Sequence, residues 1–231
     1  RSRGQLLSDL GLAYIRVMAA DLHRSVIDTA CRRLVAWLIT NGWESYDCFD
    51  GASSPLARLI SPLKPLSLRL LIQLVRRSPL NLRPLLGIRK TVSAKSLGLL
   101  ASGYSRLCRV WREPRCEHEA RRALDWLTAN RPEGYSGACW GYPFDVYSRS
   151  TIYLASTPTV VATAFIGNAF VDAYEQLGDL TYLSTARSAC NFILRDLPPI
   201  SDGDAICIPY HRDSLVPVHN ANMLAVALLS R

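Results

Sequence analysis

A seven-residue pattern occurs three times along the chain and restricts the folds open to it. It runs apolar, any, aromatic, apolar, any, any, Asn or Asp, and its copies are Val35–Asn41, Leu124–Asn130 and the weaker Cys190–Asp196. Each copy ends a stretch in which apolar residues recur at i, i+3, i+4 and i+7, the spacing of an amphipathic helix. The stripes are Ile27, Ala30, Cys31, Leu34 and Leu38, then Ala120, Ala123, Leu124 and Leu127, then Leu183, Ala186, Cys190 and Ile193.

A second kind of helix, low in charge and rich in small residues, follows each copy. We expect these helices at about Thr91–Val110, Thr159–Gln176 and Val218–Ser230. Pro158 and Pro217 suit the first turns of the last two, where the missing N–H of proline costs nothing. The alternation predicts an all-α fold of stacked helical hairpins. If the hairpins close into a ring, the amphipathic helices lie outside, and the loops that enter the inner helices meet at one mouth.

The segment GYSGACWGYPFDV, residues 134–146, precedes the second inner helix. Three glycines argue against a helix, and this many turn-forming residues argue against a buried strand. We therefore expect a shaped loop, rich in flat rings and ending in a carboxylate, that lines the central cavity. Short strands are expected only in such aromatic loops.

Charge is unevenly distributed along the chain. Residues 51–112 contain twelve Lys or Arg and no Asp or Glu, so they carry +12 while the whole chain carries +8 and the remainder −4. Such an excess favours an anionic partner: an acidic polysaccharide, an anionic lipid surface or nucleic acid. The alternative is a solvated basic face. Within this segment, residues 56–88 do not fit the repeat and are expected to form an inserted basic helical lobe in a single domain over 1–231.

The seven cysteines form no C-x-x-C pair and are odd in number, which indicates reduced thiols and no zinc site. Arg1, Arg3, Asp9 and Arg16 interrupt the first twenty residues, so no signal peptide is expected. The uncharged run from Ser150 to Val171 contains proline and asparagine and is interpreted as a buried helix, not a membrane span. We expect a cytoplasmic protein.

Three segments, YDCFDGASSP (46–55), RRSPLNLRPLLGI (76–88) and CWGYPFDV (139–146), resemble bacterial polysaccharide-biosynthesis proteins of the α/α-toroid superfamily. That superfamily also holds six-hairpin glycosidases, uronate-polysaccharide lyases and sugar epimerases. The similarity runs from about Leu34 to Arg231. It implies a protein of polysaccharide biosynthesis that acts on an anionic poly- or oligosaccharide, with no cofactor, metal or nucleic-acid partner. A complete ring needs twelve helices, and this chain supplies about three hairpins, so we expect the N-terminal half of a longer toroid.

Three carboxylates are candidate catalytic groups. Asp47 and Asp50 lie in YDCFDG, and Asp145 ends the aromatic loop. Glycoside hydrolysis uses two carboxyl groups about 5 to 9.5 Å apart across one bond, and loops at one mouth could supply them. The alternative is a local role, because Asp also bonds turn backbones and caps helices.

Aromatic residues of the same loop are candidates for stacking on the apolar face of a pyranose ring. They are Trp140, Tyr142, Phe144 and Tyr147, with Arg149 beside them. The alternative is that some of these rings anchor the loop in the core.

The segment IPYHRDSLVPVHNAN, residues 208–222, collects groups that a uronate lyase or epimerase needs: a base, an acid and groups that neutralise a carboxylate. The candidates are Tyr210, His211 and His219 as catalytic groups and Asn220 and Asn222 as binding groups. The alternative is ordinary loop polarity before a helix. We expect the carboxylates of Asp50 and Asp145 to face one cavity, with His219 at its floor.

Other classes receive less support. The chain has no G-x-S-x-G elbow, phosphate-binding loop or dinucleotide fingerprint. An isoprenoid cyclase-like toroid would use aromatic rings to stabilise carbocations and would dock a basic amphipathic helix on a membrane, but YDCFD lacks a paired-aspartate metal motif. A non-catalytic polysaccharide-binding or scaffolding subunit fits the same features. We favour a hydrolase, lyase or epimerase.

Overall fold

The computed structural model describes residues 24–60, 65–147 and 152–231. Arg149 lies outside these residues. The chain forms two compact units, residues 1–43 and residues 44–231. In the first unit, residues 24–41 are helical, and Arg32 Nε lies 2.9 Å from Asp28 Oδ2 one turn earlier. Ile27 and Leu34 of the expected apolar stripe are exposed there.

The second unit is mostly helical, which confirms the all-α prediction. Its main helices are α4 (Ala94–Trp111), α5 (Pro114–Ala129), α6 (Val160–Leu177), α7 (Leu180–Arg195) and α8 (His219–Leu229). Among the described residues, strands occur only in two short antiparallel hairpins, β1 (Val146–Tyr147) with β2 (Ile152–Tyr153), and β3 (Ile200–Asp202) with β4 (Ala205–Cys207).

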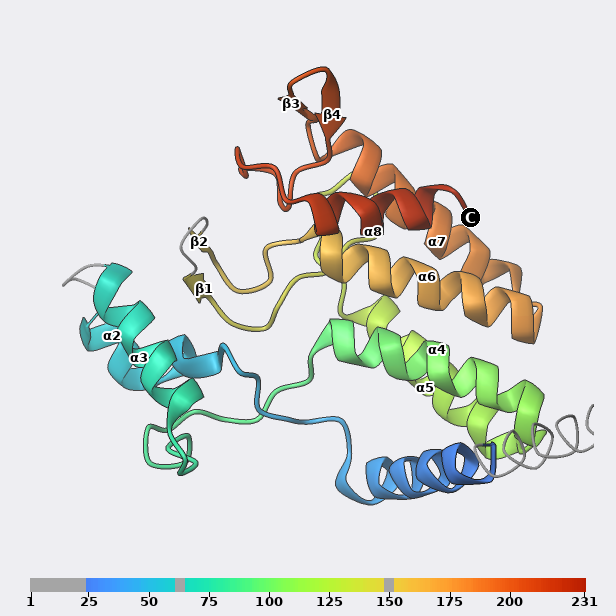
Figure 1. Ribbon diagram of the computed structural model, residues 1–231. Helices are drawn as coiled ribbons and strands as arrows, with labels where there is room; N and C mark the ends of the chain where they lie inside the picture. Colours follow the sequence, from blue (N-terminus) through green and yellow to red (C-terminus); the bar gives the residue numbers. More distant parts are fainter. Residues whose placement is uncertain (1–23, 61–64, 148–151) are drawn as a thin grey trace, which may run out of the picture. The chain divides into compact units, whose positions relative to one another are not determined.

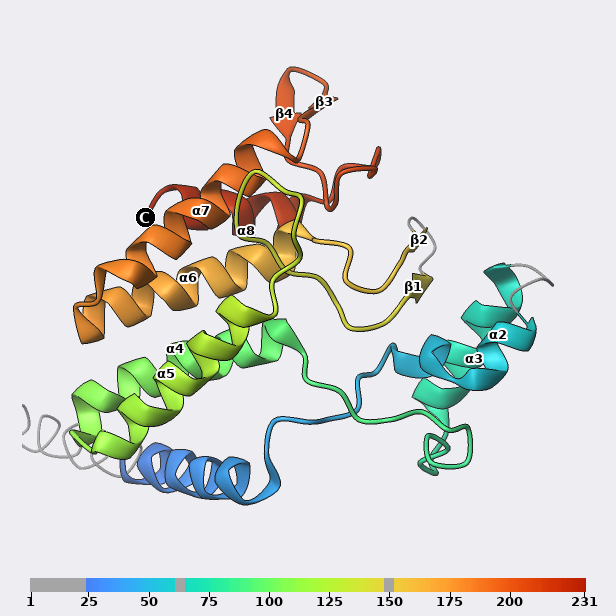
Figure 2. The same ribbon diagram turned by 180° about the vertical axis from the view of Figure 1, so that it is seen from behind.

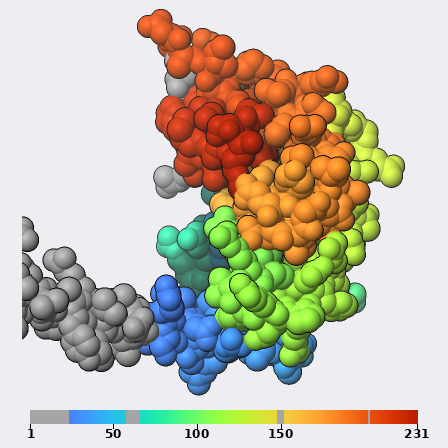
Figure 3. Space-filling model, turned by 90° about the vertical axis from the view of Figure 1, so that its right-hand side faces the viewer, coloured from blue at the N-terminus to red at the C-terminus, as the bar shows by residue number. Residues whose placement is uncertain are grey.

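The helices of this unit form two layers. Helices α4, α6 and α8 lie side by side with their amino ends on the same side (Figure 1), and α5 and α7 cover the other face of the layer (Figure 2). Helices α4 to α8 also follow one another across the space-filling view from green through orange to red (Figure 3). The amphipathic and low-charge helices therefore alternate between layers as the sequence predicts.

Helix α6 is the most buried helix because neighbours cover it on several sides. Two glycines allow its close packing: a Cβ on Gly98 of α4 would lie 2.8 Å from Ile166 Cγ1, and one on Gly167 would lie 2.5 Å from Leu228 Cδ2. Ser93 and Thr159 cap α4 and α6 by accepting hydrogen bonds from backbone N–H groups. The glycines therefore allow α4 and α8 to approach α6 closely, and the caps satisfy backbone N–H groups at the starts of α4 and α6.

Two details at the inner helices differ from expectation. Pro158 and Pro217 each precede the N-cap residue, so they stand just outside the first turn. In this position they favour an extended backbone before the helix. On α8, Leu224 and Ala227 are at least partly exposed as expected, but Leu228 is buried because it packs on Gly167.

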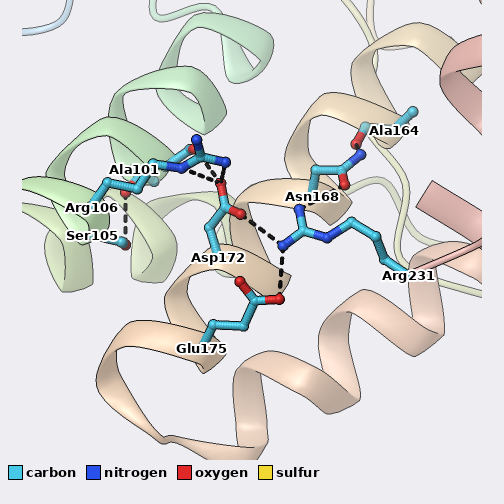
Figure 4. Close-up of polar contacts among 9 residues, drawn as sticks. Ala101, Ser105, Arg106, Ala164, Asn168, Asp172, Glu175 and Arg231 are labelled. Atoms are coloured by element: carbon cyan, nitrogen blue, oxygen red, sulfur yellow. Dashed lines mark hydrogen bonds and ion pairs between the residues drawn. The ribbon is translucent and has the colours of Figure 1, made fainter. Parts of the chain in front are cut away.

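A buried carboxylate links α4 to α6 (Figure 4). Asp172 accepts hydrogen bonds from Ser102 Oγ, from Arg106 Nη2 at 3.0 Å and from Arg231 Nη2 at 2.8 Å. Arg231 also donates to Glu175 at 3.0 Å. The cluster satisfies the charge of Asp172, which is 3% exposed.

The described residues between 50 and 77 are largely helical. They contain the short helix η1 (Asp50–Ser53), α2 (Pro55–Ile60) and α3 (Pro65–Arg77). The connector after α3 has no regular structure until a turn over residues 83–87. Apolar residues of the lobe form a core of their own, made by Ala57, Leu68, Leu71, Val75 and Ile88 with Tyr46, Leu86 and Tyr147 packed against it.

Candidate functional site

A cavity of about 740 Å³ lies in the second unit, where the segments that enter α4, α6 and α8 meet. Residues 47–49 and Lys95 come from the segment before α4 and its first turn. Residues 142–147 and Tyr153 come from the segment before α6, and residues 210–218 from the segment before α8. Helix α3 of the lobe supplies the remaining side. The lining is Asp47, Cys48, Phe49, Arg69, Ile72, Gln73, Arg76, Arg77, Lys95, Tyr142, Phe144, Val146, Tyr147, Tyr153, Tyr210, Ser214, Val216 and Val218. The convergence of these segments agrees with the expectation from the helix pattern.

The wall at residues 47–49 is held by a buried ion pair. Arg83 Nε lies 2.9 Å from both carboxylate oxygens of Asp50, and Arg83 Nη2 donates to the carbonyl oxygen of Asp47 at 2.7 Å. The backbone N–H of Asp47 donates to Asp50 Oδ2 at 3.0 Å. The Asp47 carboxylate accepts from the N–H of Phe49 at 2.9 Å, which fixes the turn at the cavity edge.

The aromatic loop is fixed by backbone contacts to the segment before α6. Gly141 pairs with Pro158, and a Cβ on Gly141 would lie 2.2 Å from the carbonyl oxygen of Thr157, so only glycine fits this approach. The N–H of Ser156 donates to the carbonyl oxygen of Tyr142 at 2.7 Å. These contacts hold Tyr142 in the cavity wall.

Three tyrosines from the two segments that precede α6 and α8 form one hydrogen-bonded group in this wall. The hydroxyl of Tyr210 bonds to those of Tyr142 and Tyr153, and the rings of Tyr153 and Tyr210 lie 5.9 Å apart. Burial raises the pKa of each phenol, and Coulombic interaction with the neighbouring phenol raises those of Tyr153 and Tyr210 further. At neutral pH all three are therefore uncharged groups that can donate hydrogen bonds.

The positive charge of the cavity lining comes from four basic residues: Arg69, Arg76 and Arg77 of α3 and Lys95 of α4. The Arg76 guanidinium lies 5.1 Å from the ring centre of Phe49, and Lys95 Nζ lies 5.5 Å from that of Tyr142. Arg69 Nε is buried without a hydrogen-bond partner among the described residues. Asp47 is the one carboxylate in the described lining, so the cavity has an excess of positive charge.

The structure separates the three candidate carboxylates. Asp47 lines the cavity, whereas Asp50 is 3% exposed and is held by Arg83 behind the wall. Asp145 lies outside the lining and accepts a hydrogen bond from the N–H of Ala155 at 2.7 Å. This bond joins the two ends of the β1–β2 hairpin. The expectation that Asp50 and Asp145 face one cavity is wrong, because backbone and guanidinium groups bind both carboxylates locally.

The candidate stacking residues are also divided. Tyr142, Phe144 and Tyr147 line the cavity. Trp140 does not: it is 1% exposed, its Nε1 donates to the carbonyl oxygen of Leu127 at 2.8 Å, and its ring stacks on Phe170 at 5.9 Å. Trp140 therefore anchors the loop in the core.

Of the candidates in residues 208–222, Tyr210 alone lines the cavity. His211 is buried against Tyr153, with ring centres 5.2 Å apart, and its burial lowers its pKa. His219 and Asn220 are exposed at the start of α8, so His219 is not at the cavity floor. Asn222 Oδ1 accepts from the N–H of Ile208 at 3.0 Å and ties the loop to α8.

Several lining residues were not singled out from the sequence, namely Phe49, Arg69, Arg76, Lys95 and Tyr153. The absence of acidic residues from residues 51–112 points to the basic ones as a group, but no spacing in the sequence identifies which of them line a cavity. Tyr153 could not be identified as a lining residue from the sequence, because nothing in its local sequence distinguishes it from a core tyrosine.

Among the described residues, no group of three or more His, Cys, Asp and Glu side chains is placed to hold a metal ion. Within the same residues, no helix combines the length and the apolar character that crossing a membrane requires. All seven cysteines are free. No protein-family model, no curated protein and no solved structure matches the chain.

Proposed function

We propose that the second unit binds an acidic oligosaccharide, or a segment of an acidic polysaccharide, in the cavity between α3 and the aromatic loop. The observation that carries this proposal is the combination of ring faces and an excess of positive charge in one lining. Phe49, Tyr142 and Tyr147, the lining rings that are at least partly exposed, offer apolar surface to pyranose rings. Arg69 and Arg76 offer guanidinium groups, which suit carboxylates because two N–H donors can meet two oxygens.

The volume and polarity of the cavity support the same ligand class. A cavity of about 740 Å³ falls within the range of small-molecule sites. The phenol hydroxyls of Tyr142, Tyr153 and Tyr210 are uncharged donors beside apolar surface, as sugar hydroxyls require. An acidic oligosaccharide as ligand accords with a role in polysaccharide biosynthesis. That role and an α/α-toroid architecture are both part of the proposal.

The geometry favours binding over hydrolysis. Two carboxyl groups across a glycosidic bond are the usual requirement for hydrolysis, and the described lining contains Asp47 alone. A second candidate function is a lyase or epimerase, which the buried Tyr210 hydroxyl favours. The Tyr210 phenol is protonated at neutral pH and would be the proton donor to a leaving oxygen, but its raised pKa makes it a weaker acid than an ordinary tyrosine.

Calorimetric titration of the full chain with an acidic uronate oligosaccharide tests the binding proposal. A neutral oligosaccharide of the same length is the control. We expect heat of binding with the acidic ligand alone, and equal affinity for both ligands, or none for either, would contradict the proposal. For the lyase alternative, ultraviolet absorbance of unsaturated uronate should rise with the unmodified chain and not with Tyr210→Phe.

A further inference from the structure

Helix α3 presents a leucine stripe that no described residue covers. Leu66, Leu70 and Leu74 recur every four residues and are 62%, 63% and 56% exposed. This spacing places them on one face of the helix. The opposite face is buried in the core of the lobe through Leu68, Leu71, Ile72 and Val75.

Most of the charged residues on and near the lobe are positive, and Asp47 is the one carboxylate in the described lining of the cavity beside α3. Arg76 and Arg77 are exposed at the end of α3, and Arg89 and Lys90 are exposed on the connector that follows the lobe. Residues 51–112 contain no acidic residue. Asp50, directly before this segment, is buried and paired with Arg83. An apolar stripe in a predominantly basic setting is the arrangement of helices that lie on anionic membranes.

We propose that α3 docks the second unit on an anionic lipid surface. The leucines enter the boundary between headgroups and acyl chains, and the arginines and lysine pair with lipid phosphates and carboxylates. Arg69, Gln73 and Arg76 on the neighbouring face of α3 line the cavity, so docking would bring the cavity beside the headgroups. This proposal stands on α3 and the basic connector that follows the lobe, and it does not depend on the ligand of the cavity.

Flotation of the full chain with vesicles tests the docking. Vesicles of phosphatidylcholine and phosphatidylserine in equal parts are compared with vesicles of phosphatidylcholine alone. We expect binding to the mixed vesicles, at least about tenfold weaker binding to the neutral ones, and release by salt, since the electrostatic part acts within a Debye length. Absence of binding to mixed vesicles at low salt overturns the proposal.

Two variants make the test specific to α3. Leu66→Ser, Leu70→Ser and Leu74→Ser together should weaken binding to mixed vesicles at least about tenfold, and Leu70→Ser alone should have a smaller effect. The matched control changes three exposed leucines of other helices, Leu99, Leu180 and Leu194, to serine and should bind as the unmodified chain does.

Circular dichroism checks that both triple variants keep their helical content. An equal loss of vesicle binding in both would overturn the docking proposal, as would unchanged binding in the α3 variant. A dimer in solution that the α3 substitutions convert to a monomer would also overturn it, because a second copy would then cover the stripe.

Discussion

The guanidinium of Arg83 and the carboxylate of Asp50, 33 residues apart, form an ion pair in which Nε lies 2.9 Å from both carboxylate oxygens. The side chains are 15% and 4% exposed, so the pair is shielded from water on both sides. Through its second contact, to the carbonyl oxygen of Asp47, Arg83 fixes the turn that enters the cavity wall. Asp50 therefore acts on the candidate site by positioning residues 47–49.

Replacing Asp50 with asparagine should lower the free energy of unfolding by about 3 kcal/mol, because it leaves the charge of Arg83 buried without a counter-ion. Urea unfolding measures this loss. Asp172→Asn is the matched control, since it also removes a buried paired carboxylate but lies outside the cavity lining. At temperatures where both variants are folded, Asp50→Asn should weaken oligosaccharide binding and Asp172→Asn should not. Normal stability of Asp50→Asn would contradict the positioning role.

The ring and the hydroxyl of Tyr142 should contribute separately to binding. Tyr142→Ala removes the ring face beside Lys95 and should weaken binding of an acidic oligosaccharide about tenfold, a change of about 1.4 kcal/mol. Tyr142→Phe keeps the ring and should weaken binding less. Calorimetry on both variants measures the difference, and identical affinities for the alanine and phenylalanine variants would show that the ring does not contact the ligand.

Alkaline pH should destabilise the second unit through the buried tyrosines. Their pKa values are raised above the ordinary value of 10.0 in the folded state. A raised folded-state pKa gives stability that is complete below the unfolded pKa and is lost as pH rises toward the folded value. The free energy of unfolding should therefore fall from about pH 10 upward. Tyr153→Phe should flatten this fall, and a slope unchanged by that substitution would contradict the burial of the phenol.

Acidic pH should also destabilise the second unit, through His211. Burial lowers its pKa below the ordinary value of 6.5, against a smaller opposing effect of Asp213. The stability that this gives is present above about pH 6.5 and is lost as pH falls toward the folded pKa, since the unfolded chain takes up the proton first. Unfolding measured between pH 7 and pH 5 should show the loss, and His211→Gln should reduce its slope. A slope that is the same in the variant would rule out His211 as its source.

The helices of the second unit were predictable from sequence because their determinants are local. The expected low-charge helices begin and end within three residues of α4, α6 and α8, and two of the expected apolar stripes lie inside α5 and α7. The positions of Trp140 and Tyr142 were not predictable, although they are two residues apart. Trp140 turns inward because Leu127 and Phe170 supply a hydrogen-bond acceptor and a stacking partner, and these contacts exist only once α5 and α6 have packed.

The basic residues of the cavity lining show the same limit of prediction from the sequence. The charge excess of residues 51–112 was evident from composition, and it indicated an anionic partner. That Arg69 and Arg76 line the same cavity as Tyr210 depends on how α3 packs on the segment before α4. A Cβ on Gly51 would lie 2.8 Å from Ile72 Cα, so this packing relies on one glycine. The spacing of apolar residues in the sequence does not predict such a contact.

Affinity for an acidic oligosaccharide in the variants Arg69→Gln and Arg76→Gln tests the central claim most directly. Each change removes one positive charge from the cavity lining, and each should weaken binding about tenfold. Arg187→Gln is the control, because this exposed arginine lies on α7 and outside the lining. Weakened binding in both cavity variants with unchanged binding in the control is the result predicted. Affinities within about twofold of the unmodified chain in both cavity variants, well under 1.4 kcal/mol, would contradict the account.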